Sequence, residues 1–113
     1  MRVRLLVAVV AVVTVLGVSA GLANPGFNDP VTLKDKTCTV SYMKVSRDYS
    51  TIVFGITNTG TVPHGFDIGG RYISGLIQPG QQKTIVAHFG PGGYRWACVS
   101  RHSTVKRGIF TIS

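Results

Sequence analysis

Two side chains with metal-binding chemistry lie close together near the end of the chain, Cys98 and His102. A cysteine thiolate and a neutral histidine both bind transition metals, and one short loop can present them to the same ion. The chain has one other cysteine, Cys38, so a disulfide between Cys38 and Cys98 is the competing interpretation. The residue types alone leave both alternatives open.

The segment before this pair has the pattern of a half-buried strand. Tyr94, Trp96 and Cys98 alternate with Arg95 and Ala97, which predicts that Cys98 points toward the core at the end of a strand. His102 and Lys106 are then expected on the loop that follows. Similar short runs, separated by glycine- and proline-rich turns, occur at 38–42, 52–56, 66–68, 73–77, 83–89 and 108–112. Such a series of strands predicts an all-β sandwich or barrel.

The start of the chain has a different pattern. Residues 1–23 combine two arginines, an aliphatic centre and small residues, which predicts a signal helix cleaved after Ala20 or, preferably, after Ala23. An uncleaved anchor is the alternative, because a bilayer is spanned by about 20 apolar residues. Residues 24–36 are rich in turn formers and are interpreted as a linker or N-terminal arm. Residues 37–113 are expected to form a single domain.

Charge and composition exclude several functions. Beyond residue 23 the chain has ten Lys and Arg, twelve in all less Arg2 and Arg4, against four Asp, and they are scattered. A nucleic-acid site needs a denser basic face, so none is expected. Neither a hydrolytic triad nor a phosphate-binding loop is evident, so we expect no enzyme. We expect a monomer that is secreted, periplasmic or at the cell surface, with membrane contact only if the leader is retained.

Three segments resemble the cupredoxins, the small blue-copper proteins. They are "FGITNTGTVPHGFDI" (54–68), "LIQPGQQKTIVAHF" (76–89) and "GPGGYRWACVSRH" (90–102). The resemblance extends from about Thr37 to Ser113 and implies a Greek-key β-sandwich of cupredoxin type. It also implies one type 1-like copper ion, bound by His64 after an Asn-x-Gly turn, by Cys98 and by His102. One thiolate and two imidazoles form a trigonal site that suits copper.

The ligand loop departs from the pattern of the family. Lys106 stands where the family usually supplies an axial methionine, and Arg101 stands where proline or glycine is frequent. The three-residue spacing between Cys98 and His102 falls between the usual loop lengths. A weak axial bond can be absent, but a lysine charge is unfavourable beside a copper ion.

The expected layout favours a copper ligand over a disulfide. In the family the first strand runs toward the metal, and Cys38 stands at the beginning of the strand that we take as the first. Cys38 is then expected at the opposite end from Cys98. A disulfide needs Cα atoms within about 7 Å, so we favour Cys98 as a ligand.

Two functions follow from these patterns. The first is an exported copper-binding protein for one-electron transfer or extracytoplasmic copper handling. Its basic rim, consisting of Arg95, Arg101, Lys106 and Arg107, would dock an acidic redox partner. The alternative is a copper-free structural or accessory module of the same fold, stabilised by a Cys38–Cys98 disulfide.

Overall fold

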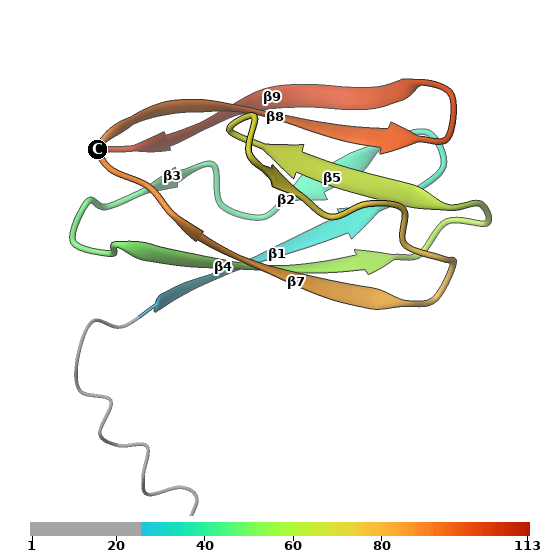
Figure 1. Ribbon diagram of the computed structural model, residues 1–113, viewed down its shortest axis with the longest axis horizontal. Coiled ribbons are helices and arrows are strands. Elements are labelled where there is room, and N and C mark those ends of the chain that lie inside the picture. Colours follow the sequence, from blue (N-terminus) through green and yellow to red (C-terminus); the bar gives the residue numbers. More distant parts are fainter. Residues whose placement is uncertain (1–25) are drawn as a thin grey trace, which may run out of the picture.

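The computed structural model describes residues 26–113, which form nine strands in two sheets (Figure 1). The strands are β1 (Gly26–Leu33), β2 (Cys38–Val40), β3 (Lys44–Val45), β4 (Thr51–Asn58), β5 (His64–Ile68), β6 (Tyr72–Ile73), β7 (Gln82–His88), β8 (Gly92–Ser100) and β9 (Thr104–Ile112). One sheet has the order β2-β1-β4-β7 and the other β3-β9-β8-β5-β6. Each contains one parallel pair, β1 with β4 and β3 with β9. The predicted all-β sandwich is confirmed.

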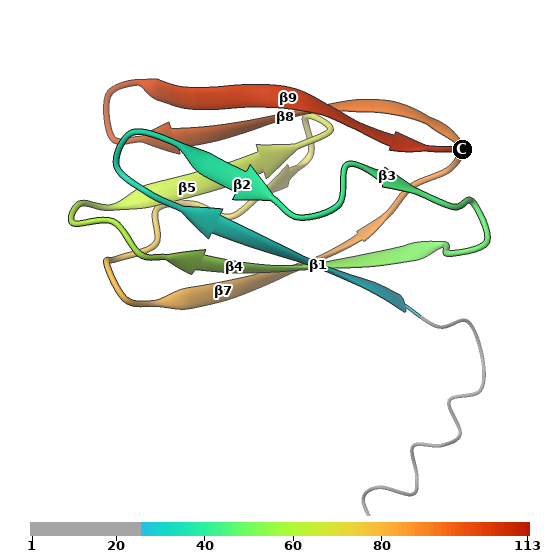
Figure 2. The same ribbon diagram turned by 180° about the vertical axis from the view of Figure 1, so that it is seen from behind.

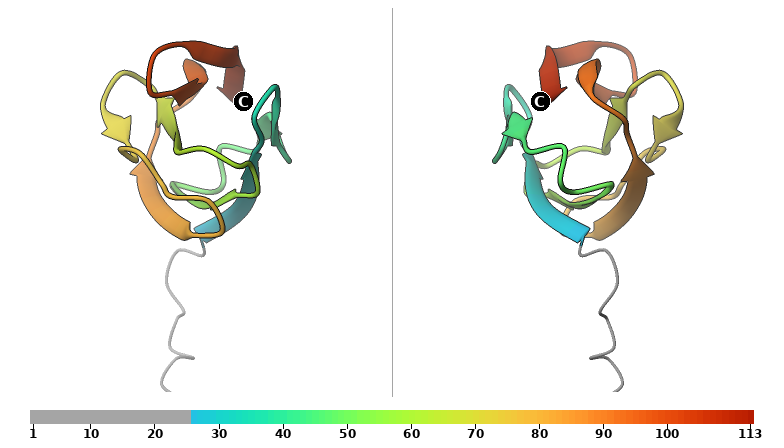
Figure 3. Two further views of the ribbon diagram at one scale, coloured as in Figure 1. Left: turned by 90° about the vertical axis from the view of Figure 1, so that its right-hand side faces the viewer. Right: turned by 90° about the vertical axis from the view of Figure 1, so that its left-hand side faces the viewer.

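The two sheets face each other around an aromatic and aliphatic core, as the end-on views show (Figure 3). Inward positions alternate along β4, where Ile52, Phe54 and Ile56 are fully buried. The Phe54 ring lies 5.6 Å from the Phe66 ring and 5.5 Å from the Phe110 ring, both on the opposite sheet. These ring contacts hold the two sheets together in the interior of the sandwich.

A strand occupies most of the segment predicted as a linker. Strand β1 lies between β2 and β4 (Figure 2), and its residues Val31 and Leu33 are buried. The prediction of a linker over 24–36 is therefore wrong for residues 26–33. The alternation is disguised because Asp29 occupies an inward position. Pro30 lies just outside the three residues that pair with β2, so its missing N–H interrupts no β1–β2 ladder bond.

Strand β1 also fixes the direction of the chain that follows. It runs parallel to β4, so both strands end at the same end of the sandwich, on the right in Figure 1. We call this the His64 end and define it by the turns 34–37, 59–63 and 101–103. Strand β2 begins there with Cys38, so its direction is the reverse of the predicted one.

The predicted signal helix over 1–23 lies outside the described residues. Within residues 26–113 no helix has the length and apolar character needed to span a membrane.

Asp29 is an acidic group in the sandwich interior. Its side chain is fully buried, and its Oδ1 accepts a hydrogen bond of 2.8 Å from the Tyr42 amide. Its Oδ2 has no hydrogen-bond partner among the described residues. Burial raises the pKa of Asp29 to about 6, although the Tyr42 hydrogen bond acts in the opposite direction. Folding therefore favours the protonated form of this carboxyl relative to the unfolded chain.

This burial predicts a pH-dependent stability. The stabilising contribution of protonated Asp29 should be fully present below its unfolded pKa near 3.8 and lost as pH rises through about 6. Asp29→Asn keeps the acceptor and stays neutral, so its Tm should exceed that of the wild type by several degrees above about pH 6. Thermal unfolding of both proteins across this range measures the difference. A difference that does not vary with pH would contradict the assignment.

Candidate metal centre at the His64 end

Cys98 forms a disulfide with Cys38 across the two sheets. Cys38 begins β2 in one sheet, Cys98 lies in β8 of the other, and their Cα atoms are 6.6 Å apart. Both residues are buried, and residues 26–113 contain no free cysteine. The expectation that the two cysteines lie at opposite ends is wrong, because the missed strand β1 reverses β2. A sulfur atom in a disulfide is not the thiolate that copper requires.

His64 begins β5 and is only 1% exposed. Its Nε2 lies 3.0 Å from Asp35 Oδ1, and its Nδ1 lies 3.3 Å from the Val99 carbonyl oxygen. A carboxylate and a carbonyl only accept hydrogen bonds, so the ring donates to one of them when neutral and to both when protonated. Each ring nitrogen is thus directed at a protein oxygen. In the neutral ring, the lone pair of the nitrogen that does not donate therefore faces an oxygen atom instead of a position open to a metal ion.

Asp35 connects the turn between β1 and β2 to the rest of the His64 end. Its Oδ1 also accepts the Thr61 amide at 2.8 Å, and its Oδ2 accepts the Thr61 hydroxyl at 2.7 Å. The hydrogen bond from His64, followed by those from Thr61, holds the pKa of Asp35 well below its usual range. Asp35 is therefore a carboxylate that orients the histidine. Sequence reasoning missed it because it lay within the predicted linker.

The Asn58–Gly60 turn explains how His64 comes to lie beside Asp35. The Asn58 side chain donates to the Val62 and Ile77 carbonyls at 2.9 and 2.8 Å and accepts the Gly60 amide at 2.8 Å. A Cβ at Gly60 would collide with Asp35 and crowd the His64 ring. The turn predicted to precede a ligand is present, and here it holds the histidine against a carboxylate.

His102 lies in a different environment. It is exposed on the turn between β8 and β9. It lines an open hollow of about 290 Å³ with Val62, Pro63, Ser100 and Arg101. The buried His64 is not part of that lining. Across residues 26–113, no group of three or more His, Cys, Asp or Glu side chains is arranged to hold a metal ion.

Lys106 is in a strand rather than on the predicted loop. It lies in β9 opposite Cys98, next to an irregularity in the β8–β9 pairing between Cys98 and Val99. Its Nζ is 3.5 Å from the Cys38 carbonyl oxygen, so its positive charge sits beside the disulfide. With sulfur bonded, His64 engaged and a lysine alongside, the side chains do not fit a type 1 copper ion in the disulfide-bonded protein.

Comparison with known proteins identifies the type of fold. No family model and no curated protein matches the sequence. Rusticyanin from Thiobacillus ferrooxidans has a TM-score of 0.63 over 80% of this chain and 79% of its own, at 13% identity. Auracyanin from Roseiflexus castenholzii has a TM-score of 0.55 over 80% of this chain and 98% of its own, at 15% identity.

A domain of a larger protein has the same architecture. A multicopper oxidase has a TM-score of 0.53 over 78% of this chain and 41% of its own, at 16% identity. The fold is therefore of cupredoxin type, and the predicted resemblance and fold class are confirmed. At these identities the likeness establishes the fold.

Proposed function

We propose that this chain is an exported cupredoxin-fold module that works without copper and acts by binding other molecules at its surface. The Cys38–Cys98 disulfide carries the proposal, because it occupies the sulfur that the family would give to the metal. An oxidising compartment outside the cytoplasm preserves such a bond. The protein then has no metal through which to carry an electron.

The disulfide also gives the sandwich a connection that a metal would otherwise supply. It joins β2 to β8, one strand from each sheet, and closes a chain segment with a sequence separation of 60 residues. The His64–Asp35 pair adds a second connection, between β5 and the turn after β1. These bonds stabilise the His64 end in the absence of an ion.

A second candidate function is copper binding by the reduced protein through His64, Cys98 and His102. It is favoured by the fold, since the rusticyanin whose structure resembles this chain is itself a copper protein. Reduction would release the Cys98 thiol. His64 would also have to leave Asp35, and His102 would have to turn inward from its surface hollow.

Copper titration separates the two candidates. Cupric ion is added to protein isolated without reductant, and to the same protein after reduction. We expect no intense thiolate-to-copper absorption and no copper retained after desalting in the unreduced protein. Intense absorption there would contradict the proposal. Absorption only after reduction, and its loss in a reduced Cys98→Ser variant, would support the second candidate.

A further inference from the structure

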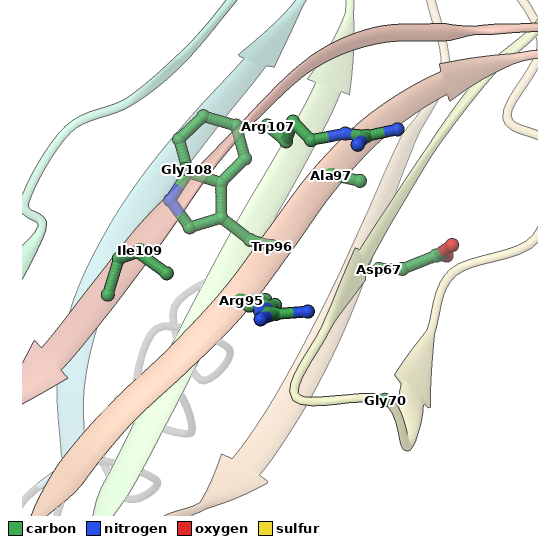
Figure 4. A pocket seen from close by; sticks show the side chains of 8 residues that line it. All are labelled: Asp67, Gly70, Arg95, Trp96, Ala97, Arg107, Gly108 and Ile109. Carbon is green, nitrogen blue, oxygen red and sulfur yellow. The ribbon is translucent and has the colours of Figure 1, made fainter.

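A second hollow lies on the outer face of the five-stranded sheet. Its volume is about 480 Å³, within the range of small-molecule sites. Strands β5, β8 and β9 and the turn before β6 contribute its walls. The lining that matters here consists of Asp67, Gly70, Arg95, Ala97, Arg107 and Ile109 (Figure 4).

The strand register explains why a hollow forms at this place. The Trp96 ring packs inward, 6.2 Å from the Phe66 ring, so its neighbours Arg95 and Ala97 point outward. Asp67 pairs with Ala97, and Ala97 pairs with Arg107, so the small Ala97 lies between two charged side chains of opposite sign. The next pair, Arg95 with Ile109, forms another side of the hollow.

Charged side chains of both signs surround Ala97, and they form no ion pairs with one another. In Figure 4, the Asp67 carboxylate lies on one side of Ala97, and the guanidinium groups of Arg95 and Arg107 lie on two other sides. The only ion pair within residues 26–113 is the one between His64 and Asp35, so these three groups form none there. Partial burial raises the pKa of Asp67, consistent with a carboxyl that lacks a cationic partner.

We propose that this hollow binds a carboxylate with an N–H donor on the adjacent carbon, from either a free amino acid or the C-terminal residue of a peptide. The ligand carboxylate accepts hydrogen bonds from Arg95 and Arg107, whose planar guanidinium groups suit that shape. The adjacent nitrogen of the ligand donates to Asp67. An apolar ligand side chain covers Ala97 and Ile109, and Ile109 is 52% exposed in the free protein.

The combination of charges decides against simpler ligands. An inorganic anion would satisfy the arginines but would be repelled by Asp67, and a cation would meet the opposite difficulty. Only a ligand with both an acceptor and a donor group satisfies all three side chains. This inference goes beyond the proposed function, because the hollow lies away from the His64 end. Ligand binding there does not depend on whether the two cysteines are joined.

Binding is measured on the full chain by calorimetry and by fluorescence. Trp96 is the only tryptophan in the chain and belongs to the lining, so its emission is followed as a second readout beside calorimetry. The probes are L-leucine and the peptide Ala-Ala-Leu, with leucine amide and Ala-Ala-Leu amide as matched probes without the carboxylate. We expect saturable binding of one or both carboxylates and its loss on amidation. Preference between leucine and the peptide identifies the source of the ligand.

Variants locate the site. Arg107→Gln and Asp67→Asn should each weaken binding by about tenfold or more, because each removes a charged hydrogen-bonding group. Arg47→Gln removes an exposed arginine that is not in the lining and should leave binding unchanged. Thermal unfolding confirms that each variant is folded. Absence of saturable binding, equal binding of the amides or of inorganic phosphate, or unchanged affinity in Arg107→Gln would overturn the inference while leaving the copper titration unaffected.

Discussion

Removal of the Cys38–Cys98 disulfide is expected to cost about 4 kcal/mol of folding free energy. The bond closes a segment with a sequence separation of 60 residues, and opening it greatly increases the entropy of the unfolded chain. The Cys38→Ala/Cys98→Ala double variant should therefore show a Tm lower by about 20 °C. Chemical and thermal unfolding of the variant and the wild type, both without reductant, measure the loss.

Reduction provides an independent comparison. Wild-type protein with reductant should unfold close to the double variant, and each single alanine variant should lose most of the same free energy, since either one abolishes the bond. The two single losses should not add in the double variant. A double variant as stable as the oxidised wild type would mean that the two sulfur atoms are not joined in solution.

His64→Ala is expected to destabilise the protein by about 3 kcal/mol. The substitution removes a buried ring and leaves a cavity. It also deprives Asp35 and the Val99 carbonyl of hydrogen bonds. His102→Ala is the matched control. His102 is exposed, so its loss should change the free energy of unfolding by less than about 0.5 kcal/mol.

The difference between these histidines separates a structural role from metal binding. If both residues were ligands of one ion, both substitutions would lower the Tm of copper-loaded protein and neither would be specially important without copper. Urea unfolding of metal-free protein therefore gives the decisive comparison. Equal effects of the two substitutions would contradict the structural role of His64.

The strands with strict alternation were predictable from sequence. Ile52, Phe54 and Ile56 on β4 and Tyr94, Trp96 and Cys98 on β8 carry large apolar side chains at every second position, and the structure places them in those strands. The fold class followed from these strands and from the turns between them. The weak strand β1 was missed because a buried acid, Asp29, interrupts its apolar face and an exposed proline, Pro30, lies within it.

The missed strand β1 explains why Cys38 and Cys98 were wrongly predicted to lie at opposite ends of the sandwich. Without β1, β2 appears to be the first strand and to run toward the predicted metal, with Cys38 at the far end. With β1 in place, the chain turns at residues 34–37 and Cys38 enters at the His64 end. A disulfide over a separation of 60 residues depends on strand direction, which no local pattern reveals.

The role of His64 was also beyond local sequence. Its position after the Asn58–Gly60 turn was predictable, but its partner Asp35 lies 29 residues upstream in another turn. Likewise, the predicted basic rim comprises residues in three environments, and Lys106 lies beside the Cys38 carbonyl oxygen. Arg95 and Arg107 line the outer hollow, whereas Arg101 lines the one beside His102. Docking of an acidic redox partner on this rim stays a prediction.

The most direct measurement of the central claim is the intact mass of the protein isolated from an oxidising compartment without reductant, before and after treatment with iodoacetamide. We predict a mass lower by the hydrogens of two thiols than that of the reduced chain, no alkylation, and a proteolytic fragment in which Cys38 and Cys98 are linked. An alkylated Cys98 together with one equivalent of bound copper in the native protein would contradict it.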